Sequence, residues 1–200
     1  SEDINSPINV SDVDNGDMDV YSFLKAFRIK NLDRVLIGSL NINSIRNKFD
    51  MLSDIVGNNL DYILIIESKL DGSFPISNFK LPGFSIPYRR DRNCFGGGLL
   101  AYIREDIPSK LLSSLPIPSD VECMIIEIRL KKVKWLLINL YNPSKGQLST
   151  NLAFLCNALD HYGLHYDNIL ILGDFNAEMT ETSMKDFCSQ FYLKNLVKEP

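Results

Sequence analysis

Two parts of the chain show the same order of strand, helix and strand, and each ends in an acidic residue just after an apolar run. In the first part the run is Tyr62–Ile66 and the acid is Glu67; in the second the run is Ile169–Leu172 and the acid is Asp174. Such nearly continuous apolar runs are typical of strands covered on both faces. A strand, helix, strand unit of this length favours a parallel pair of strands. We therefore expect two similar α/β halves.

The hydrophobic pattern also predicts the other elements. We expect a first strand within residues 34–43, a helix from Ile45 to about Val56 with Ser44 as its N-cap, and a second helix from about Thr150 to Tyr162. The Pro and Gly content of residues 71–87 predicts a long loop. The strands after this loop are expected to form antiparallel hairpins, which would make the sheets mixed. Their expected positions are about Phe84–Arg89, Gly98–Arg104, Val121–Leu130 and Lys134–Tyr141.

Polar side chains gather where the expected strands end. Asp174 and Asn176 lie two apart after the second apolar run, and Asn41 and Asn43 lie two apart after the first strand. Residues two apart in an extended backbone point to the same face, and open α/β sheets bind ligands at the carboxyl ends of strands. We therefore expect these residues and Glu67 at one edge of a two-sheet sandwich, where oxygens can hold a hard cation. An ordinary Asp/Asn turn is the alternative for Asp174.

Composition limits the broad class of protein. Two hundred residues with 45% hydrophobic content suffice for one well-buried domain. The first 20 residues are rich in Asp and Glu and lack Lys and Arg, so we expect residues 1–30 to be an acidic disordered leader and linker, with Tyr21–Lys30 as a short helix or linker. No apolar run reaches the roughly 20 residues that span a bilayer, which predicts a soluble, intracellular protein without membrane contact. Four scattered cysteines indicate neither zinc nor disulfides.

Charge limits how the chain could hold nucleic acid. The net charge is -4 and the pI is about 5.2, so overall electrostatic attraction to nucleic acid is not expected and any DNA contact must be local. A local basic rim around the three glycines 96–98 is one candidate, and solvated arginines of a hairpin turn are the alternative; the residues concerned are Arg89, Arg90, Arg92 and Arg104. The glycines do not indicate a phosphate-binding loop, because no helix start with Lys and Ser or Thr follows.

Four motifs in fixed order carry a resemblance to a known family. LNINS, LIIESKL, LINLYNPS and ILGDFN resemble the endonuclease/exonuclease/phosphatase superfamily, which implies a four-layer α/β sandwich of two mixed sheets flanked by helices. The stretch GFSIPYRRDRNCFGGGLLAYIREDIPSKLL resembles the endonuclease domain of non-LTR retrotransposons, in which a reverse transcriptase follows. The resemblance implies a domain over residues 31–200 that lacks the family's final strands and is expected to be a monomer.

The resemblance also implies a metal site. Glu67 resembles the family's metal-ligand glutamate, and a carboxylate is a hard donor suited to Mg²⁺, with Mn²⁺ as a substitute. Asn43 stands where other members have Asp or Asn near the metal. Its assignment as a metal residue rests on that correspondence.

The remaining site residues imply hydrolysis of a DNA phosphodiester. Asp174 resembles the aspartate that orients or deprotonates the attacking water, and Asn176 resembles the neighbour that helps to hold the phosphate. Asn41 resembles the asparagine that supports the metal site and Asp174. Tyr141 resembles the tyrosine that contacts the scissile phosphate, with a core aromatic as the alternative. The implied product is a nick with a 3′ hydroxyl, which primes reverse transcription, and the implied location is the nucleus.

Departures from the family pattern keep other functions open. The family's catalytic histidine follows the GDFN stretch, whereas His161 and His165 precede it, and we expect a surface or helix-capping role for His161. Because loss of a general acid lowers a rate by roughly 10²- to 10⁴-fold, a catalytically inactive, truncated remnant is one alternative. A cellular abasic-site nuclease is another, and a lipid or small-molecule phosphoester hydrolase is disfavoured by Tyr141. Ser144 stands where the nuclease branch usually has an asparagine.

Overall fold

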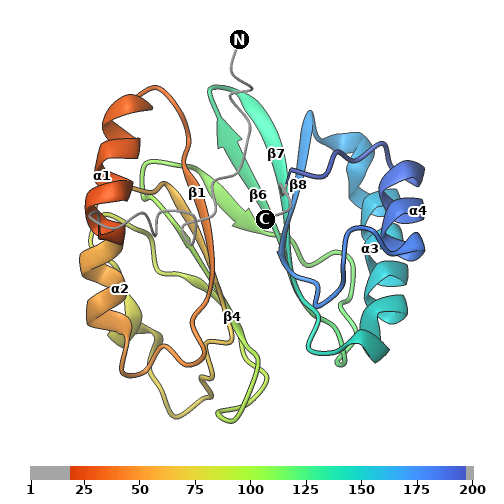
Figure 1. Ribbon diagram of the computed structural model, residues 1–200, viewed down its shortest axis with the longest axis horizontal. Coiled ribbons are helices and arrows are strands. Elements are labelled where there is room, and N and C mark those ends of the chain that lie inside the picture. Colours follow the sequence, from red (N-terminus) through yellow and green to blue (C-terminus); the bar gives the residue numbers. More distant parts are fainter. Residues whose placement is uncertain (1–18, 197–200) are drawn as a thin grey trace.

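The computed structural model describes residues 19–196, so most of the expected acidic leader lies outside the described residues. Two four-stranded sheets face each other, with α1 and α2 on the outer face of the first sheet and α3 and α4 on the outer face of the second (Figure 1). The helices are α1 (Val20–Lys30), α2 (Phe49–Val56), α3 (Leu148–Tyr162) and α4 (Thr182–Gln190), with 3-10 turns η2 (Ile76–Phe79), η3 (Lys145–Gln147) and η4 (Gly163–His165). The expected four-layer α/β sandwich is confirmed.

Both sheets are mixed, as expected. The first has the order β1-β2-β4-β3, with β1 (Ile37–Asn41), β2 (Tyr62–Ile66), β3 (Tyr88–Arg90) and β4 (Leu99–Ile103). The second has the order β5-β6-β7-β8, with β5 (Ser109–Leu111), β6 (Glu122–Leu130), β7 (Val133–Tyr141) and β8 (Asn168–Asp174). The parallel pairs are β1 with β2 and β7 with β8, joined through α2 and α3, and they are the two units that the apolar runs predict.

Three apolar clusters hold the layers together. One lies between the sheets and includes Leu64 of β2, Ala101 of β4 and Leu137 of β7. The other two lie under the helices, where Leu52 of α2 packs over the first sheet and Leu155 of α3 packs over the second. Removal of this apolar surface from water is the main favourable term for each layer.

A fully buried polar contact lies in the apolar layer between the sheets. The Tyr62 hydroxyl of β2 donates to Asn139 Oδ1 of β7 at 2.5 Å, and both residues are fully buried. Because a buried amide needs partners, the bond fixes how the two sheets face each other. The start of β2 is thereby tied to the last part of β7 across the sandwich.

The start of α2 differs from the sequence prediction. The helix begins at Phe49 with Lys48 at the N-cap position, so the prediction of a helix from Ile45 capped by Ser44 is wrong. Ser44 has φ +80° and its N–H donates to the Glu67 carbonyl at 2.8 Å. The tertiary contact with the residues after β2 therefore replaces the first turn of the expected helix.

The last strand is less buried than its sequence predicts. All seven residues of β8 are only half-buried, so the expectation that Ile169–Leu172 is covered on both faces is wrong. Within the described residues, β8 is the end strand of its sheet and pairs with β7 alone. A run of aliphatic residues predicts a strand, but it does not show whether that strand has a neighbouring strand on each side.

The segment before the first strand is a helix that contacts the sandwich. Arg28 of α1 donates from Nη2 to Asp61 Oδ2 at 2.5 Å and from Nε to the Asn59 carbonyl at 3.1 Å. Of the two alternatives for Tyr21–Lys30, the helix is therefore the one formed, while the domain boundary near residue 30 stays a prediction. Among residues 19–196, no helix has the length and apolar character needed to cross a membrane.

Candidate active site

Four strand ends meet at one edge of the sandwich. Asn41 closes β1 and pairs with Ile66, directly before Glu67, while Tyr141 closes β7 and pairs with Asp174 at the end of β8. Parallel pairing puts both carboxyl ends of each pair at the same edge. The two βα units thus bring one polar set from each sheet to a common place.

Hydrogen bonds connect these side chains across the two sheets. The Tyr141 hydroxyl donates to Glu67 Oε1 at 2.6 Å, and Asn41 Nδ2 donates to the same oxygen at 3.2 Å. Asn41 Nδ2 also contacts Asp174 Oδ2 at 3.4 Å. The expectation that Asn41 and Glu67 lie side by side is confirmed. The structure brings all four residues together, which an isolated Asp/Asn turn at Asp174 would not do.

The turn that carries Glu67 has an unusual backbone. Glu67 and Lys69 have φ values of +56° and +53°, a region that side chains other than glycine seldom adopt. The Ser68 N–H donates to the Gly98 carbonyl at 3.1 Å, and the Lys69 N–H donates to the Gly97 carbonyl at 3.0 Å. Strained backbone of this kind persists only when its surroundings fix it, and it concentrates at functional sites.

The glycines beside this turn are required by close approach. Gly98 has φ +88°, and a Cβ there would lie 2.5 Å from Ser68 Oγ. A side chain at this position would therefore push the Glu67 turn away. Gly97 and Gly98 allow close packing here, and they lead directly into the strand β4.

The hydroxyl of Tyr141 has the largest effect on the pKa of Glu67. Its hydrogen bond holds the pKa of the Glu67 carboxyl below the ordinary value of 4.5, against the opposing effect of burial, and Asn41 and Lys69 add to the lowering. Burial, together with the bond to the Glu67 carboxylate, raises the pKa of Tyr141 well above its ordinary value. At neutral pH the pair is therefore a carboxylate that accepts from a neutral phenol.

Replacing Tyr141 by Phe is expected to raise the pKa of Glu67, because the largest interaction favouring its charged form is lost. Because the folded pKa of Glu67 is lowered, its contribution to stability is present above about pH 4.5 and is lost as pH falls through the folded pKa. Carboxyl chemical shifts followed by NMR against pH would measure the change. Tyr166→Phe is the matched control, since Tyr166 makes the same kind of bond to Glu127, at 2.9 Å, outside the site. An unchanged Glu67 titration in Tyr141→Phe would contradict this.

A buried asparagine holds the turn that carries Asp174. Asn142 is fully buried, its Nδ2 donates to the Phe175 carbonyl at 2.5 Å, and its Oδ1 accepts from Asn151 Nδ2 at 2.8 Å. Asn176 Nδ2 in turn donates to the Asn142 carbonyl at 2.7 Å. The sequence prediction missed Asn142, and its place directly after a buried strand was the available signal, because a buried amide must find partners.

Asn176 lies beside Asp174, as expected, and fixes its orientation. The Asn176 N–H donates to Asp174 Oδ1 at 3.0 Å, with Asn176 at φ +45°, a conformation that asparagine tolerates. Because its side-chain nitrogen is bonded to a main-chain carbonyl, Asn176 braces the turn in this arrangement.

Asn43 meets a lysine that the sequence prediction missed. Lys69 Nζ donates to Asn43 Oδ1 and lies 3.5 Å from Glu67 Oε2. The Asn43 N–H also donates to Asn41 Oδ1 at 3.2 Å. Asn43 is thus close to Glu67, as expected, but its amide oxygen faces the ammonium group. The contact forms because the turns after β1 and β2 lie side by side, and only the folded structure shows that.

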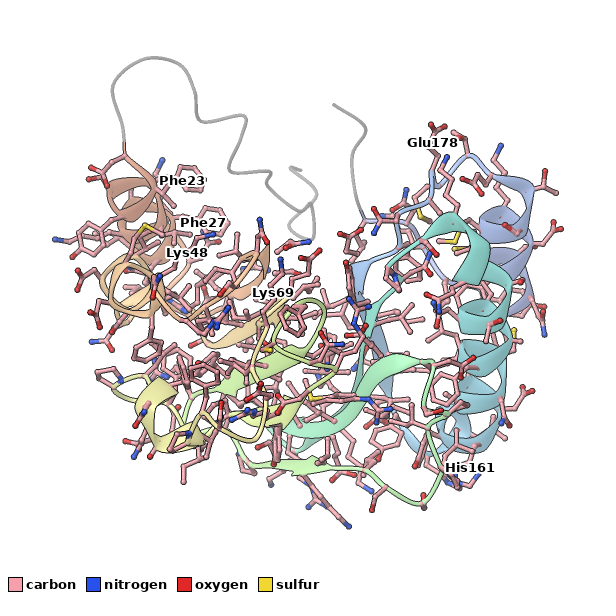
Figure 2. All side chains as sticks on the ribbon, turned by 90° about the horizontal axis from the view of Figure 1, so that it is seen from below. Phe23, Phe27, Lys48, Lys69, His161 and Glu178 are labelled. Atoms are coloured by element: carbon pink, nitrogen blue, oxygen red, sulfur yellow. The ribbon has the colours of Figure 1, made fainter. Side chains whose placement is uncertain are left out.

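The histidines and Ser144 lie outside this cluster. His161 is exposed at the end of α3, where its Nε2 lies 3.2 Å from Ser114 Oγ, and Figure 2 shows it far from Lys69. This agrees with the expected surface role. His165 is exposed in η4, and Ser144 is exposed at the start of η3.

The arginines of the expected basic rim are bonded within the protein. Arg89 pairs with Asp91 at 2.6 Å and Arg104 pairs with Asp106 at 3.0 Å. Arg90 donates to the Val121 carbonyl at 3.0 Å. Arg92 pairs with Glu122 at 2.8 Å and keeps a side-chain exposure of 38%. These four arginines are therefore not freely solvated, while a local contact of any of them with DNA stays a prediction.

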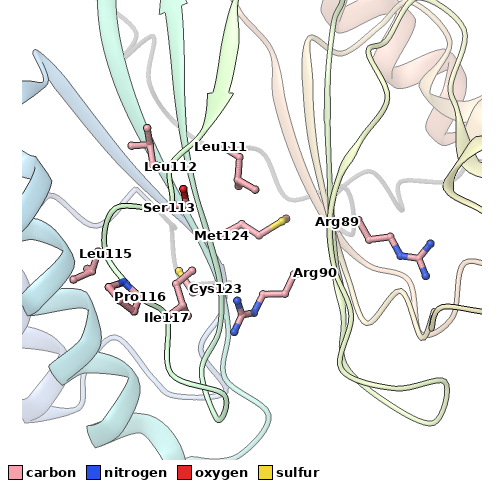
Figure 3. A pocket seen from close by; sticks show the side chains of 10 residues that line it. All are labelled: Arg89, Arg90, Leu111, Leu112, Ser113, Leu115, Pro116, Ile117, Cys123 and Met124. Atoms are coloured by element: carbon pink, nitrogen blue, oxygen red, sulfur yellow. The ribbon is translucent and has the colours of Figure 1, made fainter.

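A hollow of about 240 Å³ lies elsewhere and contains none of the expected site residues (Figure 3). Its lining is mostly apolar and includes Leu112, Ile117 and Cys123. Burial raises the pKa of the Cys123 thiol to about 12, which makes it a poor nucleophile. The hollow and the set of strand-end side chains are therefore separate features of the molecule.

The donor set at the strand ends suits a hard cation with few protein ligands. Within residues 19–196, no group of three or more His, Cys, Asp or Glu side chains is placed to hold a metal ion. Glu67 supplies an ionised carboxylate, and Asp174 supplies a second one bridged to it by Asn41. Mg²⁺ usually keeps several waters and needs only one or two carboxylates, so the residues present fit that ion.

The fold and this set of carboxylates and amides define an α/β sandwich of the nuclease and phosphatase class. The chain belongs to the Endonuclease/Exonuclease/phosphatase family, whose sequence model matches residues 38–196. The expected family is thereby confirmed. No curated protein sequence matches the chain.

Solved structures of several activities share the fold. The endonuclease domain of TRAS1, a telomere-specific non-LTR retrotransposon, matches with a TM-score of 0.63 and 11% identity over 83% of this chain and 74% of that one. The 3′ phosphatase NExo from Neisseria, bound to a product DNA hairpin, has a TM-score of 0.57 and 16% identity over 80% of this chain and 70% of that one. The human Nocturnin catalytic domain, with a bound sulfate, has a TM-score of 0.53 and 14% identity over 76% of this chain and 67% of that one. At these identities the likeness is one of fold.

Proposed function

We propose that this chain is the metal-dependent DNA endonuclease domain, residues 31–200, of a non-LTR retrotransposon, and that it nicks target DNA by hydrolysing a phosphodiester. The observation that carries the proposal is the hydrogen-bonded set of Glu67, Asn41, Tyr141 and Asp174 across both sheets. The similar fold of a retrotransposon endonuclease and of a DNA-bound phosphatase supports nucleic acid as the substrate. By the resemblance, Tyr141 stands where phosphatase, sphingomyelinase, deadenylase and pancreatic-deoxyribonuclease-like members usually carry histidine. Its Tyr-x-Pro turn is similar to that of abasic-site and retrotransposon nucleases, which supports DNA as the substrate.

The proposed cofactor is Mg²⁺, with Mn²⁺ as a substitute, and the proposed ligand is Glu67. The low pKa of this carboxyl keeps it ionised and ready to bind a cation. When bound, the ion would stabilise negative charge on the phosphoryl oxygens. Because Lys69 contacts the amide oxygen of Asn43, we propose Glu67 as the direct ligand and Asn43 as a neighbour of the site.

Each remaining residue has a proposed task. The Asp174 carboxylate takes the proton of the attacking water, and the Asn176 N–H and Asn41 Nδ2 hold its two oxygens in place. The Tyr141 hydroxyl stays protonated, and it donates its single proton to Glu67, whose carboxylate it positions beside the proposed phosphate site. Asn176 holds the turn that carries Asp174, and it does so even when no phosphate is bound.

The proposed partners follow from this reaction. The domain would act as a monomer on nuclear DNA, and a reverse transcriptase would follow it in the complete element. The 3′ hydroxyl left at the nick is the end that a reverse transcriptase extends. The resemblance to retrotransposon endonucleases supports this context, and the TRAS1 endonuclease domain, from a telomere-specific non-LTR retrotransposon, has a similar fold.

Nicking of supercoiled plasmid in Mg²⁺ or in EDTA tests the proposal. Wild-type protein is expected to nick only with Mg²⁺, and Glu67→Gln is expected to reduce nicking to the EDTA level, because an amide is a weaker ligand for a hard cation. Glu105→Gln, which makes the same charge change at an exposed loop residue, is expected to nick like wild type. Equal nicking by Glu67→Gln would refute the proposed ligand. No nicking by folded wild-type protein would favour the inactive remnant.

A further inference from the structure

Residues 92–98, which form most of the loop between β3 and β4, lie directly beside the proposed active site. Its Gly97 and Gly98 carbonyls accept the N–H groups of Lys69 and Ser68, next to Glu67. Figure 1 shows this yellow-green segment at the same edge of the molecule as the end of β1. A substrate bound at Glu67 therefore has this loop as a neighbour.

The base of the loop is anchored by a buried carboxylate. Glu122 is 7% exposed; its Oε2 accepts the Gly98 N–H at 2.7 Å and its Oε1 accepts from Arg92 Nη1 at 2.8 Å. A Cβ at Gly97 would come within 2.4 Å of the same carboxylate. Charge-assisted bonds of this kind fix geometry as well as adding stability. Glu122 thus holds the loop near both of its ends, at Arg92 and at Gly98.

The tip of the loop presents an aromatic ring to solvent. Asn93 Oδ1 accepts the N–H groups of Phe95 and Gly96, at 3.0 and 3.1 Å, which forms a tight turn. Phe95 itself is 88% exposed, although phenylalanine is among the residues most often found buried. The turn therefore displays a large apolar ring without covering it.

The guanidinium of Arg92, paired with Glu122 at 2.8 Å, lies against the same turn. The Arg92 side chain is 38% exposed, and its Nε donates to the Gly96 carbonyl at 3.1 Å. A Cβ built on Gly97 would lie 2.7 Å from Arg92 Nε, and the Gly97 carbonyl accepts the Lys69 N–H. The guanidinium is therefore close to the turn that carries Glu67.

We infer that the loop of residues 92–98 binds one nucleotide of a nucleic-acid substrate next to the cleaved phosphodiester, with Phe95 stacked on an unpaired base and Arg92 against a backbone phosphate. The inference rests on the proposed function for the identity of the neighbouring site. A base has an aromatic face for the ring and a linked phosphate for the guanidinium, whereas a simple phosphoester offers only the anion. The loop thus selects nucleic acid as the substrate class.

Binding in EDTA tests the inference without hydrolysis. Affinity for a short single-stranded oligonucleotide would be measured by fluorescence anisotropy for wild type, Phe95→Ala and Phe95→Trp. Phe95→Ala is expected to weaken binding by about 5- to 100-fold, and Phe95→Trp to preserve it, because stacking depends on the ring. Leu164→Ala removes another exposed apolar side chain, 96% exposed in η4, and is expected to bind like wild type.

A stacking signal separates this role from a structural one. With 2-aminopurine in the oligonucleotide, wild type and Phe95→Trp are expected to quench its fluorescence, and Phe95→Ala is expected not to. Unchanged affinity and quenching in Phe95→Ala, or no binding by wild type, would overturn the inference even if plasmid is nicked. Phe95-dependent binding by a protein that does not nick would support the inference while the proposed hydrolysis fails.

Discussion

Asp174→Asn is expected to lower the rate of Mg²⁺-dependent nicking by about 10²- to 10⁴-fold, the usual contribution of a positioned general base. Asparagine has the shape of aspartate and keeps an oxygen for the Asn176 N–H, which Asp174 Oδ1 accepts at 3.0 Å. It cannot take up a proton from water, and its amide group no longer offers two acceptors. The variant should therefore fold normally while the chemical step becomes slow.

The comparison that isolates this effect is Asp160→Asn. Asp160 is an exposed carboxylate on α3, so the substitution makes the same chemical change away from the strand ends. Nicking rates at saturating plasmid, with thermal unfolding of each variant measured alongside, would separate loss of chemistry from loss of fold. A rate for Asp174→Asn equal to that of Asp160→Asn would exclude Asp174 as the base.

Gly173→Ala is expected to destabilise the protein by more than about 3 kcal/mol, because the new Cβ has no space. Gly173 pairs with Leu140 in the parallel contact of β7 with β8, and a Cβ built on it would lie 1.8 Å from the Leu140 carbonyl oxygen. The clash is with main chain, which cannot rotate away as a side chain would. One of the strands must shift, and Asp174 and Tyr141 at their ends must shift with it.

Chemical denaturation would measure this loss as a change in the free energy of unfolding. Gly146→Ala is the matched control, since a Cβ at Gly146, in η3, meets nothing within 4 Å. That variant should stay within about 0.5 kcal/mol of wild type, as substitutions without a special mechanism usually do. If Gly173→Ala unfolds at the same denaturant concentration as Gly146→Ala, close packing at this strand end is not what requires glycine.

Much of the fold could be predicted because its strongest signals are local. The run Tyr62–Ile66 is a buried strand with the predicted bounds, and α3 extends the predicted helix by two residues at its start. β5 and α4 were missed, since a three-residue strand and a mostly polar helix give little periodic signal. The meeting of Asn41 with Glu67 followed from the rule for parallel pairs.

The contacts that organise the site are mostly long-range and were not predictable. Ser44 is a good N-cap by residue type, yet its N–H bonds to the carbonyl of Glu67, 23 positions further along the sequence. Lys69 contacts Asn43, and Asn142 holds the turn after β8 through partners on other elements. Residue type indicates what a side chain can bond to, while only folding decides which partner is near.

The sequence by itself therefore determined the two βα units, the mixed sheets and the polar residues at their ends, because apolar runs and strand-end acids act through local periodicity and the geometry of parallel pairing. Only the tertiary structure decided how these ends combine: Tyr141 of one sheet donates to Glu67 of the other, and Asn41 joins Glu67 to Asp174. It also left β8 half-buried and the ring of Phe95 exposed. The physical reason is that burial and hydrogen bonding depend on which distant surfaces pack together, and no local pattern encodes that.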